Sequence, residues 1–166
     1  MGEVLTLEQA VQNVSDIRAQ GGTLVLTNGH FDLLHVGHLD YLERARALGS
    51  VLFVGVNGDG STRRLKGAGR PLVPAEERAR LLAALAPVST CIIFEEDTAI
   101  HLVETLRPEV YVKGGDYAAP AGGAAKPLPE RAPVEAYGGH VALIEYMPGH
   151  STSELIARVR ALPEGM

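Results

Sequence analysis

The 166-residue sequence lacks several features that mark particular classes of protein. It has one cysteine, so no disulfide can form within the chain. The setting of Cys91 in the apolar run CIIF predicts a buried strand thiol, with a catalytic thiol as the minor alternative. The longest apolar run, Leu81 to Val88, is less than half a membrane span, and the first residues do not resemble a signal peptide. We therefore expect a cytoplasmic protein that does not cross a membrane.

Excess positive charge is also missing. The formal net charge is −5, which argues against nucleic-acid binding because that depends on Lys and Arg neutralising phosphates. Neither GxGxxG nor GxxxxGK[ST] occurs, which counts against a dinucleotide-dependent oxidoreductase and a P-loop kinase. Four cations, Arg63, Arg64, Lys66 and Arg70, fall within the Gly-containing stretch STRRLKGAGRP. We interpret this stretch as a loop that either meets a small polyanion or is simply solvated.

The length and the apolar content of 46% are typical of one compact domain, predicted here to span residues 1–166. Apolar periodicity predicts helices over 7–20, 38–48, 74–85 and 97–107 and from 151 onward, and strands over 23–27, 51–56, 91–94, 110–113 and 141–144. Thr6 with Gln9 and Ser151 with Glu154 form capping boxes, and Asp97 is the expected cap of its helix.

This alternation of strands and helices predicts an α/β fold. We expect a single Rossmann-like domain with an about five-stranded, mostly parallel sheet and helices on both faces. Ligands of such sheets lie beyond the carboxyl ends of the strands. The segment 118–133 has no apolar period, and we interpret it as a long surface loop that is either an insertion or a mobile cover for a pocket.

The strongest chemical pattern is TNGHFDLLHVGHLDYL, which joins the first predicted strand to the next helix. His35 and His38 are three residues apart and share one face of a helix start, and Gly37 between them lets a phosphate approach the backbone. Two imidazoles there can donate hydrogen bonds to a phosphoryl group as charge develops. Zinc binding and structural packing remain the minor alternatives, since HVGH lacks the Glu of HExxH and a marked third ligand.

Together these residues resemble the HxGH nucleotidyltransferase superfamily, in particular its cytidylyltransferase-like branch. HVGH follows NGHFD, and VNGD, RLKG with Arg70-Pro71, KGGDY, YGG and STS then occur in the order seen in D-glycero-β-D-manno-heptose 1-phosphate adenylyltransferases. HxGH alone specifies only the superfamily, whereas the ordered set over nearly the whole chain favours the heptose branch. That branch often occurs fused to a sugar kinase, and the chain is similar to its stand-alone form.

The resemblance implies transfer of AMP from ATP to a sugar 1-phosphate, giving ADP-heptose and pyrophosphate. Mg²⁺ is expected to arrive with the triphosphate, without a dedicated protein metal site, and a homodimer or higher homo-oligomer is expected. His35 and His38 are the implied catalytic residues. The implied nucleotide-binding residues are Thr27, Asn28, Gly29, His30, Phe31, Gly37, Lys113, Gly114, Asp116, Tyr117, Ser151, Thr152 and Ser153. The residues implied for the substrate phosphate or pyrophosphate are Asp32, Asn57, Asp59, Arg64, Lys66 and Arg70.

The added motifs also have physical interpretations of their own. Ser151 to Ser153 at a helix start can cap the helix, hold phosphate oxygens, or do both. The glycines of KGGDY allow a base to lie against the backbone, with a plain turn as the alternative. The chain departs from the heptose pattern at His30, Ser50, His150 and Ser153, where His30 replaces a common Cys. Two rival functions remain: a cytidylyltransferase acting on glycerol phosphate or a related alcohol phosphate, and a nucleotide-sensing module without turnover.

Overall fold

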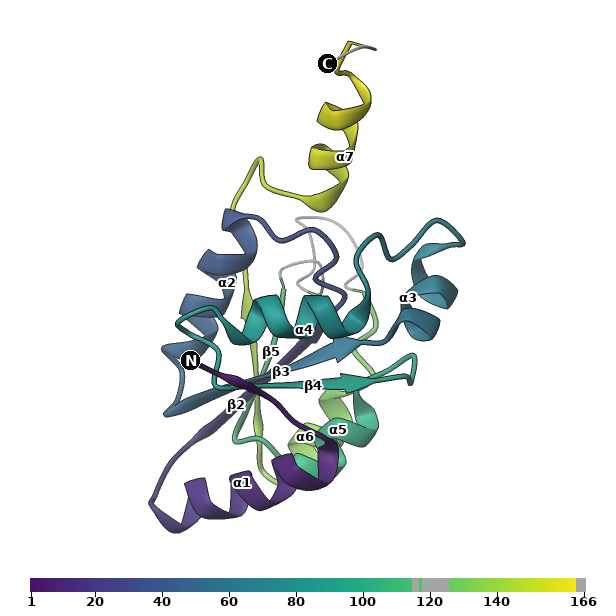
Figure 1. Cartoon of the computed structure of the whole chain (residues 1–166). Helices are drawn as coiled ribbons and strands as arrows, with labels where there is room; N and C mark the ends of the chain where they lie inside the picture. Colours follow the sequence, from purple (N-terminus) through teal and green to yellow (C-terminus); the bar gives the residue numbers. More distant parts are fainter. Residues whose placement is uncertain (115–116, 118–125, 164–166) are drawn as a thin grey trace.

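A computed structural model of the chain describes residues 1–114, 117 and 126–163 (Figure 1). Along the chain the elements are β1 Glu3–Val4, α1 Leu7–Ala19, β2 Leu24–Gly29, α2 Val36–Arg46, β3 Val51–Asn57, α3 Asp59–Lys66, α4 Ala75–Ala83, β4 Thr90–Phe94, α5 Ile100–Leu106, β5 Val110–Gly114, α6 Arg131–Ala136, β6 His140–Ile144 and α7 Thr152–Arg160.

The strands of the described residues form one sheet of six, in the order β1-β4-β3-β2-β5-β6, and all of their pairings are parallel. The α/β, Rossmann-like expectation is confirmed, with six strands where about five were expected. The additional strand, β1, has only two residues, and both are exposed. A strand this short has no period to detect, and only its pairing with Thr90 and Cys91 of β4 reveals it.

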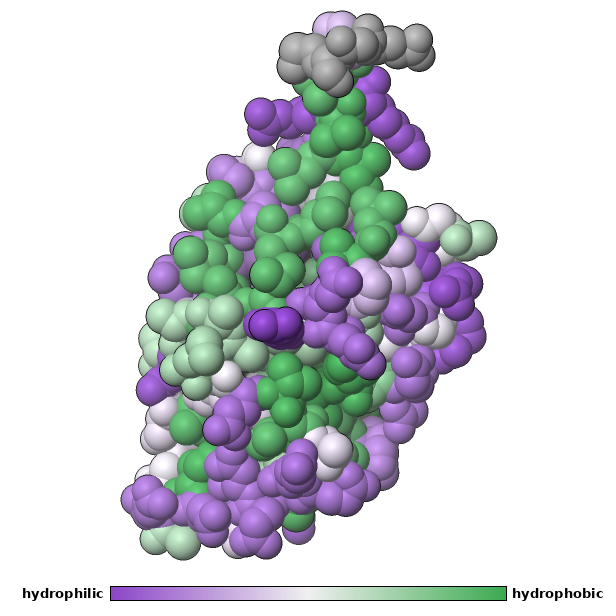
Figure 2. Space-filling model, viewed as in Figure 1, coloured by the Kyte–Doolittle hydropathy of each residue, from purple (hydrophilic) through white to green (hydrophobic). Residues whose placement is uncertain are grey.

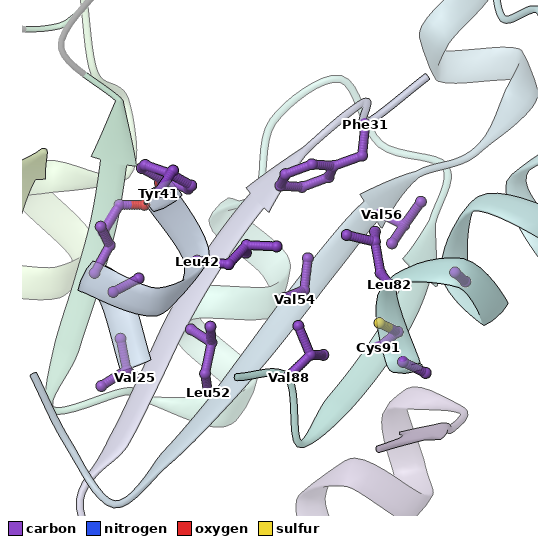
Figure 3. Packing of buried hydrophobic residues seen from close by; sticks show 14 of the residues in the cluster. Val25, Phe31, Tyr41, Leu42, Leu52, Val54, Val56, Leu82, Val88 and Cys91 are labelled. Carbon is purple, nitrogen blue, oxygen red and sulfur yellow. Dashed lines mark hydrogen bonds between the residues drawn. The ribbon is translucent and has the colours of Figure 1, made fainter. Parts of the chain in front are cut away.

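Helices cover both faces of the sheet, and a separate apolar core lies under each layer (Figure 1). One core joins α2 and α4 to the sheet through residues such as Leu42, Leu52, Val54 and Leu82 (Figure 3). The other lies beneath α1, α5 and α6. Cys91 belongs to the first core, and burial raises the pKa of its thiol to about 12, so it is the buried strand thiol that the sequence predicts.

Two local expectations are wrong. The basic stretch begins as a helix rather than a loop, because α3 runs from Asp59 to Lys66 and carries Arg64. The helix expected at Asp97 begins later, at Ile100, and Ala99 is its N-cap residue. The Asp97 carboxylate instead accepts a hydrogen bond from Arg64 Nε over 2.8 Å. The side chain of Asp97, which the sequence predicts to cap a helix, therefore forms an ion pair with Arg64 instead.

The predicted loop over 118–133 divides into parts. Residues 118–125 lie outside the described residues, so the expectation of a mobile cover is not tested. Residues 126–130 are not helical, as expected, but α6 begins at Arg131, inside the predicted loop. The short α6 includes Pro133, which weakened any helical pattern at that point.

The last helix, α7, contributes to neither of the two apolar cores. The Ser151 hydroxyl accepts a hydrogen bond from Glu154 N over 3.1 Å, which confirms Ser151 as the cap, while the Glu154 carboxylate accepts from that hydroxyl and not from the backbone N–H that a full capping box requires. No residue of α7 is buried, and the helix projects from the body of the protein (Figure 1). Apolar surface continues along it (Figure 2), and the side chains of Val159 and Leu162 are exposed. Among the described residues, no helix is both long and apolar enough to cross a membrane.

Candidate active site

A cavity of about 670 Å³ lies at the carboxyl ends of the strands, where parallel α/β sheets bind their ligands. Strands β2, β3 and β5 contribute residues from their last positions, and the starts of α2 and α7, the end of α3 and several loops contribute the others. Of the site residues expected from the sequence, those lining this cavity are Asn28, Gly29, His30, Phe31, Asp32, His35, Gly37, His38, Asn57, Lys66, Arg70, Lys113, Gly114, Tyr117, Ser151, Thr152 and Ser153.

The two histidines stand together at the start of α2. His35 is the N-cap residue, and its ring stacks on that of His38 with centroids 3.9 Å apart. Both Nδ1 atoms are buried and have no hydrogen-bond partner in the described part of the chain. A buried N–H without an acceptor is costly, so we assign the proton of each neutral ring to Nε2. Each ring then keeps an N–H donor on the atom that is not enclosed.

Burial keeps these rings neutral. Desolvation, aided by the neighbouring His35, lowers the pKa of His38 to about 4. Desolvation and His150 likewise lower the pKa of His35, against a smaller opposing effect of Glu154. At neutral pH the free protein therefore presents two uncharged imidazole donors, which suit hydrogen bonding to an anionic phosphoryl group without adding fixed charge.

Phe31 in the turn before α2 and Gly37 in the first turn of α2 shape this part of the site. Phe31 has a φ of 46°, which lies in the left-handed region that non-glycine residues seldom adopt. Its ring packs against His38 with centroids 5.3 Å apart, so the strained turn is stabilised by a ring contact. A Cβ on Gly37 would come within 3.0 Å of both His35 Nδ1 and the Cβ of His150. Glycine at this position is what allows the His35 ring to lie against the helix start.

Asn28 and Lys113 link the ends of β2 and β5. The Asn28 Oδ1 accepts hydrogen bonds from Lys113 Nζ over 3.0 Å and from the Tyr111 hydroxyl over 2.6 Å. Lys113 is only 8% exposed, and desolvation lowers its pKa to about 8. Its ammonium also lies 5.0 Å from the ring centroid of Tyr117. The ammonium group of Lys113 is thus a positioned, partly desolvated cation that lines the cavity at the end of β5.

On the far side of β5 the cavity has an aromatic wall. A Cβ on Gly114 would lie 1.9 Å from the hydroxyl oxygen of Tyr146. Only glycine at this position therefore leaves room for the Tyr146 side chain against the end of β5. Tyr117, whose ring lies near the Lys113 ammonium, also lines the cavity. The start of α7, Ser151 to Ser153, completes this wall with hydroxyl groups and free backbone N–H groups.

The basic cluster does not act as one group. Lys66 and Arg70 line the cavity, whereas Arg64 does not and is paired with Asp97. Arg70 Nε lies 2.6 Å from Asp32 Oδ2. The same carboxylate accepts hydrogen bonds from the backbone N of Leu72 and Val73 over 2.8 and 2.9 Å, so Asp32 anchors the segment that carries Arg70.

Other expected residues lie beneath the cavity or beyond it. Thr27 is fully buried, and its hydroxyl donates to Val112 O over 2.9 Å. Asp59 accepts from Ala75 N and pairs with Arg78 Nη2, 2.9 Å away. Asp116 lies outside the described residues. These placements give Thr27 and Asp59 structural contacts and leave them away from the cavity wall.

Several residues at the site were missed from the sequence. Arg78 is fully buried, and its guanidinium donates to the backbone oxygens of His30, Asn57 and Val73, so it fixes the strand ends below the cavity. The only sequence signal was an arginine on the apolar face of a predicted helix. The cavity lining also includes Tyr41, Asp97, Thr98, Lys126, Glu130, Tyr146 and His150. These residues come from different elements and loops, and apart from Tyr41, which lies in TNGHFDLLHVGHLDYL, they fall outside the quoted motifs.

The described residues contain no group of three or more His, Cys, Asp and Glu side chains arranged to hold a metal ion. The carboxylate of Asp32 is already satisfied by Arg70 and two backbone N–H groups. The donor set therefore fits a metal that is carried by a ligand better than one caged by the protein.

Comparisons with known proteins identify the family of the chain. The model of the family "Cytidylyltransferase-like" matches residues 26–158. The chain is 47% identical over 156 residues to "Bifunctional protein HldE" of Syntrophotalea carbinolica, covering 93% of this chain and 31% of that protein. It is 49% identical over 142 residues to the protein of the same name of Geobacter sulfurreducens, covering 86% and 28%. The chain thus spans about a third of the length of these curated relatives.

A solved structure shares the fold. It is titled "lipopolysaccharide core biosynthesis protein" and comes from Thermoplasma volcanium. The TM-score is 0.60 at 25% sequence identity, and the match covers 76% of this chain and 98% of that one. The family match, the identity to these relatives and the paired histidines at the sheet edge confirm the resemblance drawn from the motifs. The chain belongs to the cytidylyltransferase-like family and is a nucleotidyltransferase.

Proposed function

We propose that the protein transfers AMP from ATP to a sugar 1-phosphate, D-glycero-β-D-manno-heptose 1-phosphate, and releases pyrophosphate. The observation that carries the proposal is the stacked, neutral pair of His35 and His38 in the wall of a cavity that is also lined by the described residues of the KGGDY motif and by the STS motif of the heptose branch. The identity to proteins named HldE supports the same substrate class.

In the proposed reaction an oxygen of the sugar phosphate attacks the α-phosphorus of ATP. The bond from that phosphorus to the bridging oxygen of the β-phosphate breaks, and pyrophosphate leaves with the electron pair. No proton has to move within the protein, because the attacking oxygen is already anionic. The Nε2–H groups of His35 and His38 would donate to the transferring phosphoryl group, where charge builds in the transition state.

The remaining residues would hold the two substrates. The aromatic wall of Tyr117 and Tyr146 and the start of α7 suit the base and the triphosphate. Lys66 and Arg70 suit the sugar phosphate or the leaving pyrophosphate. Mg²⁺ would enter with ATP and screen the triphosphate charge, and the reaction would take place in the cytoplasm.

The decisive experiment is a pyrophosphate-release assay with each pairing of ATP or CTP with heptose 1-phosphate or glycerol 3-phosphate. We expect turnover with ATP and heptose 1-phosphate, and a higher kcat/KM for ATP than for CTP. A preference for CTP with glycerol 3-phosphate would replace the proposal with the cytidylyltransferase alternative.

A matched pair of variants tests the phosphate-binding part. Lys66→Ala is expected to raise KM by about 10- to 100-fold for whichever substrate its ammonium contacts, the effect of one charge-assisted hydrogen bond. Arg64→Ala, on the same helix but paired with Asp97, is the control and should change KM less than threefold. Equal effects of the two substitutions would mean that the basic segment acts only through its overall charge.

A further inference from the structure

Glu130 is a buried acidic residue that the reaction above does not use. It is the residue before α6, it is only 4% exposed, and it lines the cavity. Its Oε1 accepts a hydrogen bond from Ala99 N over 2.8 Å. This hydrogen bond engages one of the two carboxylate oxygens, Oε1. A carboxylate oxygen removed from bulk water needs a donor, and here the open side is the cavity.

The contact with Ala99 places Glu130 at the β4 corner of the site. Thr98, next to Ala99, follows β4 and lines the same cavity. In the sheet, β4 is separated from β2 by β3, so the two strand ends lie about 10 Å apart at the usual spacing of parallel strands. His35 and His38 follow β2. A span of this order is comparable to the length of a phosphorylated sugar.

The two ends of the cavity differ in chemistry. Beyond β5 are the tyrosines and the start of α7, which suit a base and phosphates. The β4 corner offers the acceptor oxygen of Glu130 and the hydroxyl of Thr98. A carboxylate there repels a triphosphate and accepts hydrogen bonds from uncharged hydroxyl groups. It also favours the charged form of Lys113, which lies at the end of β5 between the two regions.

Resting on the proposed function, we propose that Glu130, together with Thr98, binds the hydroxyl groups at the end of the sugar farthest from its reacting phosphate. In a heptose 1-phosphate that end is the C6–C7 side chain. Glu130 is then a specificity-determining residue that favours a heptose over a hexose, because the shorter sugar leaves the carboxylate oxygen without its donor.

The test compares two sugar phosphates in Glu130→Gln. Glutamine keeps an oxygen for Ala99 N but replaces the second acceptor with an NH₂ donor. With ATP saturating, we expect kcat/KM for heptose 1-phosphate to fall about 10- to 100-fold. For β-D-mannose 1-phosphate, which lacks C7, it should change less than threefold. The KM for ATP and the Tm should match those of the wild type.

Two further variants separate binding from a structural role. Glu135 lies on α6, the helix that Glu130 precedes, and its exposed carboxylate is 3.4 Å from Arg131. Glu135→Gln should leave both substrates unaffected. Thr98→Val should lower the preference for the heptose in the same direction as Glu130→Gln. An equal loss for both sugars, or a lower Tm with unchanged sugar preference, would show that Glu130 only secures Ala99 and would overturn the proposal.

This outcome is distinct from a failure of the proposed function. If the wild type releases no pyrophosphate with any sugar 1-phosphate, the function is wrong. Calorimetric titration of heptose 1-phosphate into wild type and Glu130→Gln still decides the role of Glu130. Equal affinity, or no binding to either, rejects the sugar subsite, whereas a loss of affinity confined to the variant supports it.

Discussion

The side of the cavity formed by β2 and the start of α2, the β2–α2 flank, is backed by a packed apolar core. The side formed by the start of α7, the α7 flank, belongs to a helix that buries no residue. Around His38, the side chains of Phe31, Tyr41 and Leu42 are buried and contact the sheet (Figure 3). Helix α7 has no buried residue, yet its first turn lines the same cavity. The flank proposed for chemistry is therefore preorganised, and the flank proposed for nucleotide binding is held mainly by local helix capping.

The largest expected difference between the flanks is in stability. Leu42 is fully buried, so Leu42→Ala should lower the free energy of unfolding by about 2 to 5 kcal/mol. Val159 on α7 is 65% exposed, and Val159→Ala should change it by less than about 0.5 kcal/mol. Urea denaturation of both variants checks this. A large loss in Val159→Ala would mean that α7 is packed in solution and would remove the contrast.

The next effect concerns turnover. His38→Ala should lower kcat by about 100-fold or more while ATP affinity changes little, because a donor to developing charge acts mainly in the transition state. His35→Ala should do likewise. Steady-state kinetics with calorimetric ATP binding measures both quantities. Normal turnover in the two variants would show that the preorganised flank does not stabilise the phosphoryl group.

A smaller effect is expected at the start of α7. Ser151→Ala removes the hydroxyl that caps the helix, which costs the helix about 1 kcal/mol. We expect KM for ATP to rise about two- to tenfold, with an unchanged Tm because α7 buries no residue. Ser15→Ala, an exposed serine of α1, is the matched control. If KM for ATP stays at the wild-type value, the start of α7 does not bind the triphosphate.

The last prediction concerns the acid sensitivity of the β2–α2 flank, which appears only below neutral pH. Desolvation lowers the pKa of both His30 and His38 from 6.5 to about 4 in the folded protein. Between these values the unfolded chain binds more protons, so these histidines make the free energy of unfolding fall as the pH drops from 6.5 to 4, and the loss is absent above 6.5. Thermal melts across this range should show a shallower decline for His38→Gln than for the wild type. A parallel decline would contradict the assignment.

Much of the site was predictable because its groups are close in sequence. His35, Gly37 and His38 fall on one helix turn, and β2 before them ends at Gly29. Because parallel sheets bind ligands beyond the carboxyl ends of their strands, this order alone predicts that the three residues lie at the cavity. The capping serine of α7 was equally local. The sequence could not show that Arg64 and Lys66, two positions apart on α3, differ in their surroundings: Lys66 lines the cavity, whereas Arg64 pairs with Asp97.

The sequence by itself determined the alternation of strands and helices, the two caps at Thr6 and Ser151 and the histidine pair, because each depends on residues within a few positions of one another. Only the tertiary structure decided which distant residues share the cavity. Glu130 meets Ala99 across 31 positions, and Arg78 reaches His30 across 48. Such contacts arise from the packing of whole elements against the sheet, and they leave no periodic mark in the sequence.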